Sequence, residues 1–417
     1  MRREASVYLD LDGSVHHVGQ LWANIRNRQE SAVFQYSDEW LKQDIRFTMD
    51  PLLPATPGPF YTQPGQALFG FISDSAPDRW GKTLMRREER RRASLENRVP
   101  RTLFEIDFVL GVNDSARQGA LRFKSATDGP FLADRDGFGV PPLVELARLL
   151  TAVERFEDDA ENAEDMKLLL APGSSLGGAR PKASVLDRDG SLLIAKIPSK
   201  SDDHDIIRWE AVTLKLAEHA RIRVEKWRLE EIQDHAVLFV SRFDRTGAAR
   251  IPYLSAMTML GAAERETHSY LEVCDAIQRF GALPGEDMEE LWRRIVFTVL
   301  VSNTDDHLRN HGFLYSGVDG WRLSPMFDVN PVPVDLGPRV LATSIDLEDA
   351  SASLELAMEH AAYFEVNHQT AVRIIREVAG AVARWRNVAR ALGLSVNEIE
   401  RMNSAFEHSD TEIAASL

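Results

Sequence analysis

Two aspartates, a histidine and an asparagine lie close together in the segment NTDDHLRNHGFL, residues 303–314. The segment follows an apolar run, IVFTVLV, that reads as buried core, and ionised carboxylates are costly to bury unless they are paired or bind a metal. Asp305 and Asn310 have the spacing D-x-x-x-x-N, with which kinases orient an attacking hydroxyl through the aspartate and bind magnesium through the asparagine. Because both are ordinary turn residues, a solvated turn remains the alternative for this pair taken alone.

A second acidic position follows downstream. Asp328 lies in LSPMFDVNP, after the strand-like stretch GWRLSP. Magnesium prefers oxygen ligands, and Asn310 and Asp328 offer an amide oxygen and a carboxylate. The sequence therefore predicts a magnesium site at Asn310 and Asp328, with Asp305 as the residue that orients the acceptor hydroxyl.

The preceding part of the chain has two features that could bind the phosphates of a nucleotide. Gly177 and Gly178 in SSLGGARPK allow backbone N–H groups to approach a phosphate, although the stretch is neither a Walker A motif nor G-x-G-x-x-G. Lys196 lies inside the apolar strand SLLIAKIPS, where its charge needs a partner such as a phosphate or Glu210 of the following helix. An edge-strand lysine that reaches solvent is the alternative.

These residues need strands and helices to position them. The first 125 or so residues read as strand-rich with one helix, and a hairpin is predicted to turn at Asp12-Gly13. Further on, the pattern predicts a helix over 142–154, two strands joined at Asp189-Gly190, a helix in RWEAVTLKLAEHA and strands in KWRLEEI and AVLFVSRFD. Beyond about residue 255 the pattern is mostly helical. A strand-rich half followed by a helical half indicates a bilobal α+β fold.

Composition sets outer limits on the function. A chain of 417 residues suggests two or three domains. The single cysteine, Cys274, excludes an internal disulfide and favours a reducing cytoplasm. We expect no signal peptide and no membrane span. The net charge of −15 argues against nonspecific nucleic-acid binding, and the basic cluster MRREERRR (85–92) is either a solvated helix face or a partner contact.

The chain also resembles a known family. SSLGGARPKA, LLIAKIPS, VSRFDR, NTDDHLRNHGFL and LSPMFDVNP look like the consecutive motifs of the HipA family, the serine/threonine kinase toxins of bacterial toxin–antitoxin pairs. LFGFISDSAPDRWG and LGVNDSARQGALRF resemble its N-terminal subdomain. The resemblance implies a protein-kinase-like fold with an all-helical C-terminal lobe. It divides the chain into an N-terminal subdomain (1–128), a kinase N-lobe (129–250) and a C-lobe (251–417).

The resemblance also implies roles for individual residues around ATP and Mg²⁺. These are Asp305 in catalysis with His307 in support, Asn310 and Asp328 as metal ligands, Lys182, Lys196, Gly177 and Gly178 at the phosphates, the backbone of Ser241 and Phe243 at adenine, and Ser175 as the autophosphorylated serine. Ser174 is a rival acceptor. Met259, where some members have a polar residue, leaves the choice of substrate open, and Asp306 stands where some members have glycine.

The family implies phosphorylation of a protein, with an aminoacyl-tRNA synthetase as the best-known target class. Its usual partner is a small helix-turn-helix antitoxin (HipB-like), so contact with DNA is expected only through that partner. The main alternative is a small-molecule phosphotransferase, because such kinases use the same Asp–Asn pair and a second metal-binding Asp. A non-enzymatic, antitoxin-binding scaffold is disfavoured because every catalytic position is filled.

Overall fold

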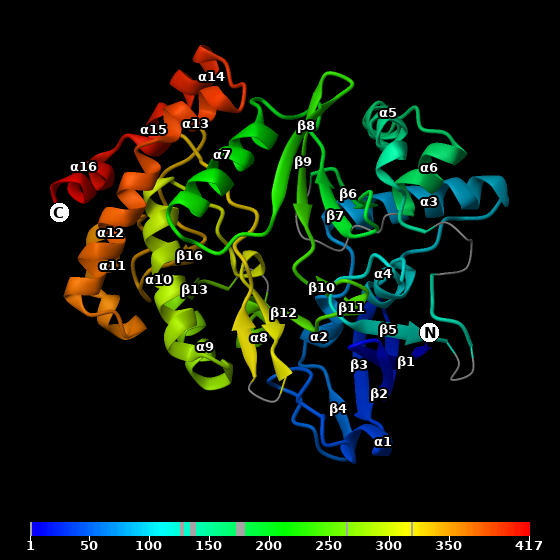
Figure 1. Ribbon diagram of the computed structural model, residues 1–417. Helices are drawn as coiled ribbons and strands as arrows, with labels where there is room; N and C mark the ends of the chain where they lie inside the picture. Colours follow the sequence, from blue (N-terminus) through cyan, green and yellow to red (C-terminus); the bar gives the residue numbers. More distant parts are fainter. Residues whose placement is uncertain (1, 126–128, 134–138, 172–179, 264–265, 318–319) are drawn as a thin grey trace. The chain divides into compact units, whose positions relative to one another are not determined.

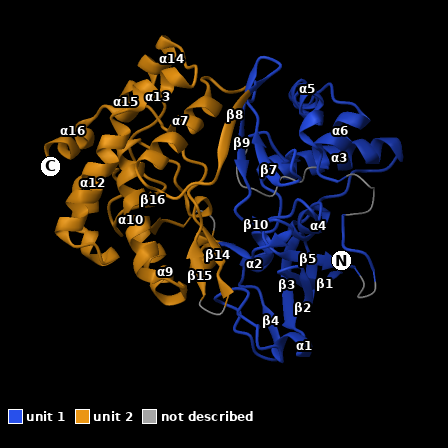
Figure 2. Ribbon diagram, in the orientation of Figure 1, with its two compact units in different colours: residues 1–200, 231–254 blue, residues 201–230, 255–417 orange. Residues whose placement is uncertain are grey.

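The chain folds into two compact units. A computed structural model describes residues 2–125, 129–133, 139–171, 180–263, 266–317 and 320–417 (Figure 1). The first unit comprises residues 1–200 and 231–254, and the second comprises 201–230 and 255–417 (Figure 2). The chain therefore crosses between the units three times. The three-part division predicted from the sequence, 1–128, 129–250 and 251–417, stays a prediction.

The first unit begins with a five-stranded antiparallel sheet in the order β4-β3-β2-β1-β5. Its strands are β1 (Arg2–Leu11), β2 (Ser14–Arg26), β3 (Gln29–Tyr36), β4 (Pro59–Tyr61) and β5 (Leu121–Lys124). Asp12 and Gly13 join β1 to β2 with φ angles of 49° and 80°. Two positive φ angles in a two-residue loop match the twist of the flanking strands. The predicted hairpin at Asp12-Gly13 is thus present.

The described residues of the first unit form six helices: α1 (Asp38–Leu41), α2 (Gly70–Ser73), α3 (Arg79–Leu95), α4 (Glu105–Gly111), α5 (Leu146–Glu157) and α6 (Ala163–Leu170). A 3₁₀ turn, η1 (Leu143–Glu145), precedes α5. The strand-rich start holds four helices instead of the one predicted. Three of them have only four to seven residues, which is too short for apolar periodicity to show.

The second sheet of this unit runs in the order β6-β7-β9-β8. Its strands are β6 (Lys182–Leu186), β7 (Leu192–Lys196), β9 (His235–Ser241) and β8 (Trp227–Ile232), through which the chain returns from the second unit. Helices α3, α5 and α6 bury their apolar faces against Val185, Leu193 and Phe239 of this sheet (Figure 1). Two further short strands, β10 (Arg245–Thr246) and β11 (Ala249–Arg250), form a separate pair.

Helices dominate the second unit. They are α7 (Ile206–His219), α8 (Ala256–Leu260), α9 (Tyr270–Phe280), α10 (Pro284–Leu300), α11 (Leu354–Glu359), α12 (His368–Val382), α13 (Trp385–Ala391), α14 (Val396–Arg401), α15 (Asn403–Phe406) and α16 (Ser409–Ser416). The 3₁₀ turns η2 (Leu308–Asn310) and η4 (Ala361–Phe364) lie between them. The described helices include none that is long and apolar enough to cross a membrane.

Helix α7 joins the second unit through aromatic packing. Trp209 lies 6.2 Å from Trp385 and 6.0 Å from Phe406, measured between ring centroids. Trp385 and Phe406 themselves stack at 4.6 Å with an interplanar angle of 9°. Burial of three large rings explains why a helix that follows the N-terminal strands in sequence packs with the C-terminal helices.

Short strands interrupt the predicted helical half. β14 (Gly312–Tyr315) pairs antiparallel with β15 (Trp321–Leu323), and β13 (His268–Ser269) pairs parallel with β16 (Thr343–Ser344). A strand β12 (Tyr253–Ser255) lies where the chain re-enters the second unit. The α+β kinase-like fold class holds, and the hairpin β14–β15 links the two predicted metal-binding segments.

Candidate active site

The first unit brings two lysines face to face. Lys182 of β6 and Lys196 of β7 are direct partners across the antiparallel ladder, so both side chains leave the same face of the sheet. Like charges in opposite positions destabilise a sheet. The Lys182 side chain is buried, and its Nζ lies 3.2 Å from the Asp78 carboxylate. Two ammonium groups on one face of the sheet make a place suited to an anion.

Asp78 is a site residue that the sequence reasoning missed. It is the N-cap of α3, where its Oδ1 accepts a hydrogen bond from the Gly81 N–H at 2.8 Å. Its Oδ2 faces Lys182. The available signal was the position of an aspartate after Pro77 and before a helical run, which is a typical start of a helix. That signal predicts the cap but not the contact with a strand a hundred residues later.

The predicted adenine-binding segment is fixed by buried ion pairs. Arg242, which lies between Ser241 and Phe243, donates to the Asp244 carboxylate and to the carbonyls of Ala116 and Arg117. Burial alone would raise the pKa of Asp244, but the guanidinium groups of its two arginine neighbours hold it well below its ordinary value. This segment is therefore tied to the loop before β5. The contact of Ser241 and Phe243 with adenine stays a prediction.

In the second unit the two adjacent aspartates have opposite environments. Asp305 is exposed, whereas Asp306 is 3% exposed. Asp306 Oδ2 accepts hydrogen bonds from the Tyr270 hydroxyl at 2.5 Å and from the Thr298 hydroxyl at 3.5 Å, and it lies 3.2 Å from His311 Nε2. Burial alone would raise the pKa of Asp306, but His311 and Tyr270 bring it below its ordinary value. The buried Asp306 carboxylate therefore supports the loop from inside, and the Asp305 carboxylate remains at the surface.

The amide of Asn310 is oriented by the same loop. Its Nδ2 donates to the Asp305 carbonyl at 3.1 Å, which leaves Oδ1 as the atom able to bind a cation. The backbone N–H groups of His307 and Asn310 close the turn by donating to the carbonyls of Asp305 and His307. His307 Nδ1 is buried and has no hydrogen-bond partner among the described residues.

Asp328 reaches the same region through the hairpin β14–β15. The Ser324 N–H donates to the Gly312 carbonyl at 2.8 Å, so the strands bring the segments that contain Asn310 and Asp328 to one end of the hairpin. Asp328 is half-buried and has a left-handed φ of 57°. Such a backbone is unusual for a residue other than glycine and is common at functional sites.

Further bonds hold the segment after Asp328. The Asn330 N–H donates to Asn303 Oδ1 at 3.2 Å, and the Thr213 hydroxyl of α7 donates to the Val329 carbonyl at 2.6 Å. In the described part of the chain, no group of three or more histidine, cysteine, aspartate or glutamate side chains could hold a metal. An amide oxygen and a single carboxylate are nevertheless enough for magnesium that also binds phosphates and water. The donor set of Asn310 and Asp328 therefore fits that ion.

Some predicted site residues lie outside the described ranges or belong to different units. Ser174, Ser175, Gly177 and Gly178 lie outside the described residues. Glu210 is buried in α7 of the second unit, whereas Lys196 belongs to the first. Their pairing stays a prediction. Met259 is buried in α8 and does not form part of an exposed surface.

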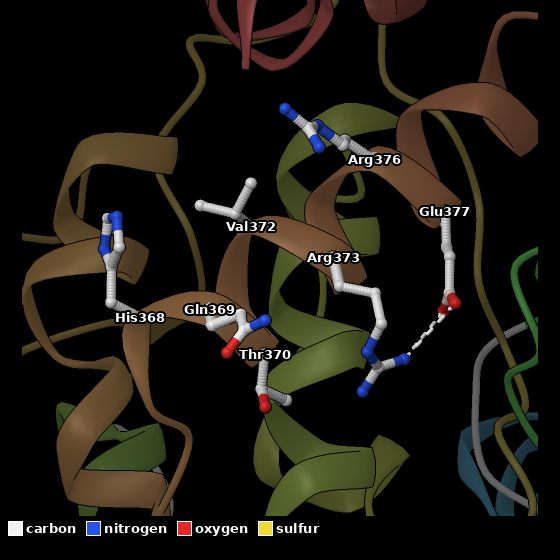
Figure 3. Close-up of a pocket in the computed structure, with 7 residues that line it drawn as sticks. All are labelled: His368, Gln369, Thr370, Val372, Arg373, Arg376 and Glu377. Atoms are coloured by element: carbon white, nitrogen blue, oxygen red, sulfur yellow. Dashed lines mark hydrogen bonds and ion pairs between the residues drawn. The ribbon is translucent and has the colours of Figure 1, made fainter.

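A separate surface pocket lies along α12 (Figure 3). Its volume is about 760 Å³, and its lining comprises His368, Gln369, Thr370, Val372, Arg373, Arg376 and Glu377. None of the described residues predicted for the active site lines it. Glu377 accepts from Arg373, and also from Arg221 and Arg293. The charges at this pocket therefore largely serve to pair helices.

Comparisons with known proteins identify the family of the chain. The family model described as "HipA-like C-terminal domain" matches residues 174–385, and the one described as "HipA N-terminal domain" matches residues 9–104. A protein of Haemophilus influenzae named "Putative kinase" is 23% identical over 210 residues, which cover 44% of this chain. The match spans only 61% of the length of that relative.

A solved structure of a HipA chain shows the same fold. The HipA chain of a Shewanella oneidensis toxin–antitoxin complex with HipB and operator DNA superimposes with a TM-score of 0.68 at 15% identity, covering 99% of this chain and 96% of that one. A Helicobacter pylori proinflammatory kinase, CtkA, gives a TM-score of 0.45 at 15% identity, covering 58% of this chain and 90% of its own. The first similarity extends over both units.

Proposed function

The chain belongs to the HipA family, and from this premise we propose that it is an ATP-dependent serine/threonine protein kinase, the toxin of a cytoplasmic toxin–antitoxin pair. The observation that carries the proposal is the direct pairing of Lys182 with Lys196. Two ammonium groups on one face of the sheet favour the binding of a multiply charged anion at that place. The phosphates of ATP supply such an anion, and they are the group that a kinase must grip.

The second unit supplies the groups for phosphoryl transfer. Asp305 accepts a hydrogen bond from the serine or threonine hydroxyl of the substrate, orients it toward the γ-phosphate and receives its proton. Asp306 is buried against Tyr270 and His311 and positions Asp305 through the loop backbone. Because phosphoryl transfer depends mainly on positioning and electrostatics, a rigid loop is an advantage.

Asn310 and Asp328 hold magnesium in this proposal. Magnesium held by these two residues would offset part of the negative charge of the phosphates. The bond from Asn310 Nδ2 to the Asp305 carbonyl supports this role, because it directs the amide oxygen away from the backbone and fixes its orientation. Hydrogen bonds at Val329 and Asn330 restrict the backbone that carries Asp328.

Transfer of a radiolabelled phosphate tests the proposal. Wild-type protein with Mg²⁺ and γ-labelled ATP should label protein, whereas Asp305→Asn should not. In cells, phosphoproteomics of wild type against Asp305→Asn identifies the target, for which an aminoacyl-tRNA synthetase is the first candidate. Label that appears only on a sugar or an antibiotic would instead support the alternative, a small-molecule phosphotransferase of kinase-like fold.

The proposed partner is a small helix-turn-helix antitoxin like HipB. The fold-level similarity to a HipA that was solved with HipB and operator DNA supports this partner. We expect an adjacent gene for such a protein, and its co-expression should relieve growth arrest caused by this chain. DNA should be retained by the mixture of both proteins and not by this chain alone. Normal growth on expression, with no such neighbour gene, would contradict the toxin assignment.

A further inference from the structure

Exposed apolar side chains are concentrated in one segment of the second unit, residues 332–347, which we term the apolar segment. Val334, Leu336, Val340 and Leu347 are 56%, 44%, 51% and 71% exposed. Isolated exposed hydrophobic residues are normal on a protein surface. Four large aliphatic side chains within so short a stretch form an apolar area of the kind that marks an interaction site.

The backbone beneath these side chains is ordered by hydrogen bonds. The Val334 N–H donates to the Ser404 hydroxyl of α15 at 3.1 Å. The Leu341 N–H donates to the Ala350 carbonyl at 2.7 Å, and the Ala352 N–H donates to the Arg339 carbonyl at 3.0 Å. A segment that is fastened on both sides cannot readily turn its aliphatic side chains inward. The exposure of Val334 and Val340 is therefore a fixed property of this segment.

The apolar segment is hydrogen-bonded to the loop that carries Asp305. The Ala342 N–H donates to the carbonyl of Thr304, the residue before Asp305, at 3.0 Å. Ala342 and Asp305 are both exposed. Val340 lies two residues before Ala342, a span of at most about 7 Å in an extended chain. An aliphatic surface thus begins close to the carboxylate proposed to receive the acceptor hydroxyl.

Acidic side chains lie within the apolar segment and directly after it. Asp335, Glu348 and Asp349 are exposed. The single cation of the stretch, Arg339, is bound to Asp410 at 2.6 Å and to the Val299 carbonyl at 2.9 Å. A partner that matches this surface offers aliphatic groups together with positive charge.

We propose that the apolar segment docks the stretch of the protein substrate that carries the acceptor serine or threonine. The matching stretch has an aliphatic residue near the acceptor and a lysine or arginine farther along. This inference rests on the proposed kinase function and specifies the class of its substrate. Continuity with the Asp305 loop favours a substrate over other partners, since only a substrate must reach that residue.

A positional peptide library around a fixed serine or threonine, with Mg²⁺ and γ-labelled ATP, tests the proposal. Wild type should select aliphatic residues near the acceptor and basic residues beyond. Leu336→Ser and Val340→Ser should raise the KM for the selected peptide about tenfold, which is a typical loss for an aliphatic contact, and leave peptide-independent ATP hydrolysis unchanged. Val396→Ser is the matched control, because Val396 is 70% exposed on α14 of the same unit.

Charge reversal addresses the acidic part separately. Glu348→Lys with Asp349→Lys should reduce the preference for basic residues, whereas Glu359→Lys, at an exposed position of α11, should not. Unchanged peptide KM and selection in all segment variants of an active kinase would overturn the docking role alone. A wild type that labels no peptide and no protein would overturn the kinase function itself. Loss of antitoxin binding or of self-association at unchanged peptide KM would assign the surface to that partner and also refute the proposal.

Discussion

The Tyr270 hydroxyl donates a 2.5 Å hydrogen bond to Asp306, so the second of two adjacent aspartates supports the loop from inside. The first, Asp305, stays exposed. Neighbouring residues of an extended or turning chain point in different directions, so burial of one carboxylate directs the other outward. The pairing explains how a loop beside the buried helix α10 tolerates two carboxylates.

The two aspartates should respond differently to mutation. Tyr270→Phe leaves Asp306 with one donor fewer and should lower the free energy of unfolding by about 1–3 kcal/mol, with a partial loss of phosphoryl transfer. Asp305→Asn should abolish transfer and change stability by about 0.5 kcal/mol or less, as is usual at exposed positions. Urea denaturation and label transfer measure both. Equal loss of stability in the two variants would contradict this division of roles.

Replacing each of the two paired lysines with alanine should also have a different effect. Lys196→Ala should weaken ATP binding about 10- to 100-fold by calorimetry, through loss of a charge-assisted bond to phosphate. Lys182→Ala leaves the buried Asp78 without its cation and should cost about 3 kcal/mol of stability even without ATP. Lys200→Ala is the matched control, since Lys200 is exposed and pairs with Asp158. Unchanged ATP affinity in Lys196→Ala would remove the argument for a phosphate site.

The anchoring of Arg242 predicts a selective kinetic effect. Arg242→Lys keeps the charge but loses the fork that contacts Asp244 and the carbonyls of Ala116 and Arg117. We expect the KM for ATP to rise several-fold while kcat changes little, because the segment positions the nucleotide and not the acceptor. Arg188→Lys, at the exposed turn between β6 and β7, is the control. A fall in kcat at unchanged KM would show that the anchor serves another step.

The buried Asp50 predicts how the stability of the fold depends on pH. Burial raises its pKa to about 6, although the backbone N–H groups of Leu52 and Phe71 act in the opposite direction. A raised folded-state pKa means that the folded chain binds more protons than the unfolded chain between pH 4 and 6, so this group's contribution to stability falls as pH rises through that window. Subtracting the urea-derived stability of Asp50→Asn from that of wild type should reveal this slope. A difference that is flat from pH 4 to 6 would argue against the shift.

Autophosphorylation of Ser175 is the last prediction, and it concerns a residue outside the described ranges. A phosphoserine adds about −1.5 to −2 charges, which would repel the phosphates of ATP at the glycine-containing loop. We therefore expect that incubation with Mg-ATP modifies Ser175 and switches the enzyme off, provided that Asp305 and Asp328 are intact. Mass spectrometry with a parallel activity assay measures this. Full activity of protein phosphorylated there, or no phosphate on Ser174 or Ser175, would refute it.

Local patterns predicted much of the fold. The turn at Asp12-Gly13 and the helix predicted over 142–154, observed as η1 and α5, depend on neighbours within a few residues, so the sequence carries their signal directly. The short helices α1, α2 and α4 carry no such periodic signal. The membership of α7 in the second unit was also out of reach, because it depends on ring contacts with residues far along the chain.

The residues of the candidate site show the same contrast between local patterns and tertiary contacts. The types and spacing of Asp305, Asn310 and Asp328 suggested their chemistry because a metal site needs particular oxygen ligands. The residues that support this loop were not predicted. Tyr270 and His311 are ordinary core residues in a one-dimensional pattern, and only the fold shows that both meet Asp306. Supporting residues act through tertiary contacts, which a sequence read alone does not contain.

The route of the chain has a consequence for synthesis on the ribosome. β9 lies between β7 and β8 in its sheet but follows α7 in sequence, so that sheet cannot close before α7 has emerged. The indole N–H of Trp209 in α7 meets Glu398, 189 residues later. At about 5–20 residues per second, this helix waits roughly 10–40 seconds for the partners that cover it. A nascent chain stalled near residue 250 therefore displays an uncovered apolar helix, a natural binding site for ribosome-associated chaperones.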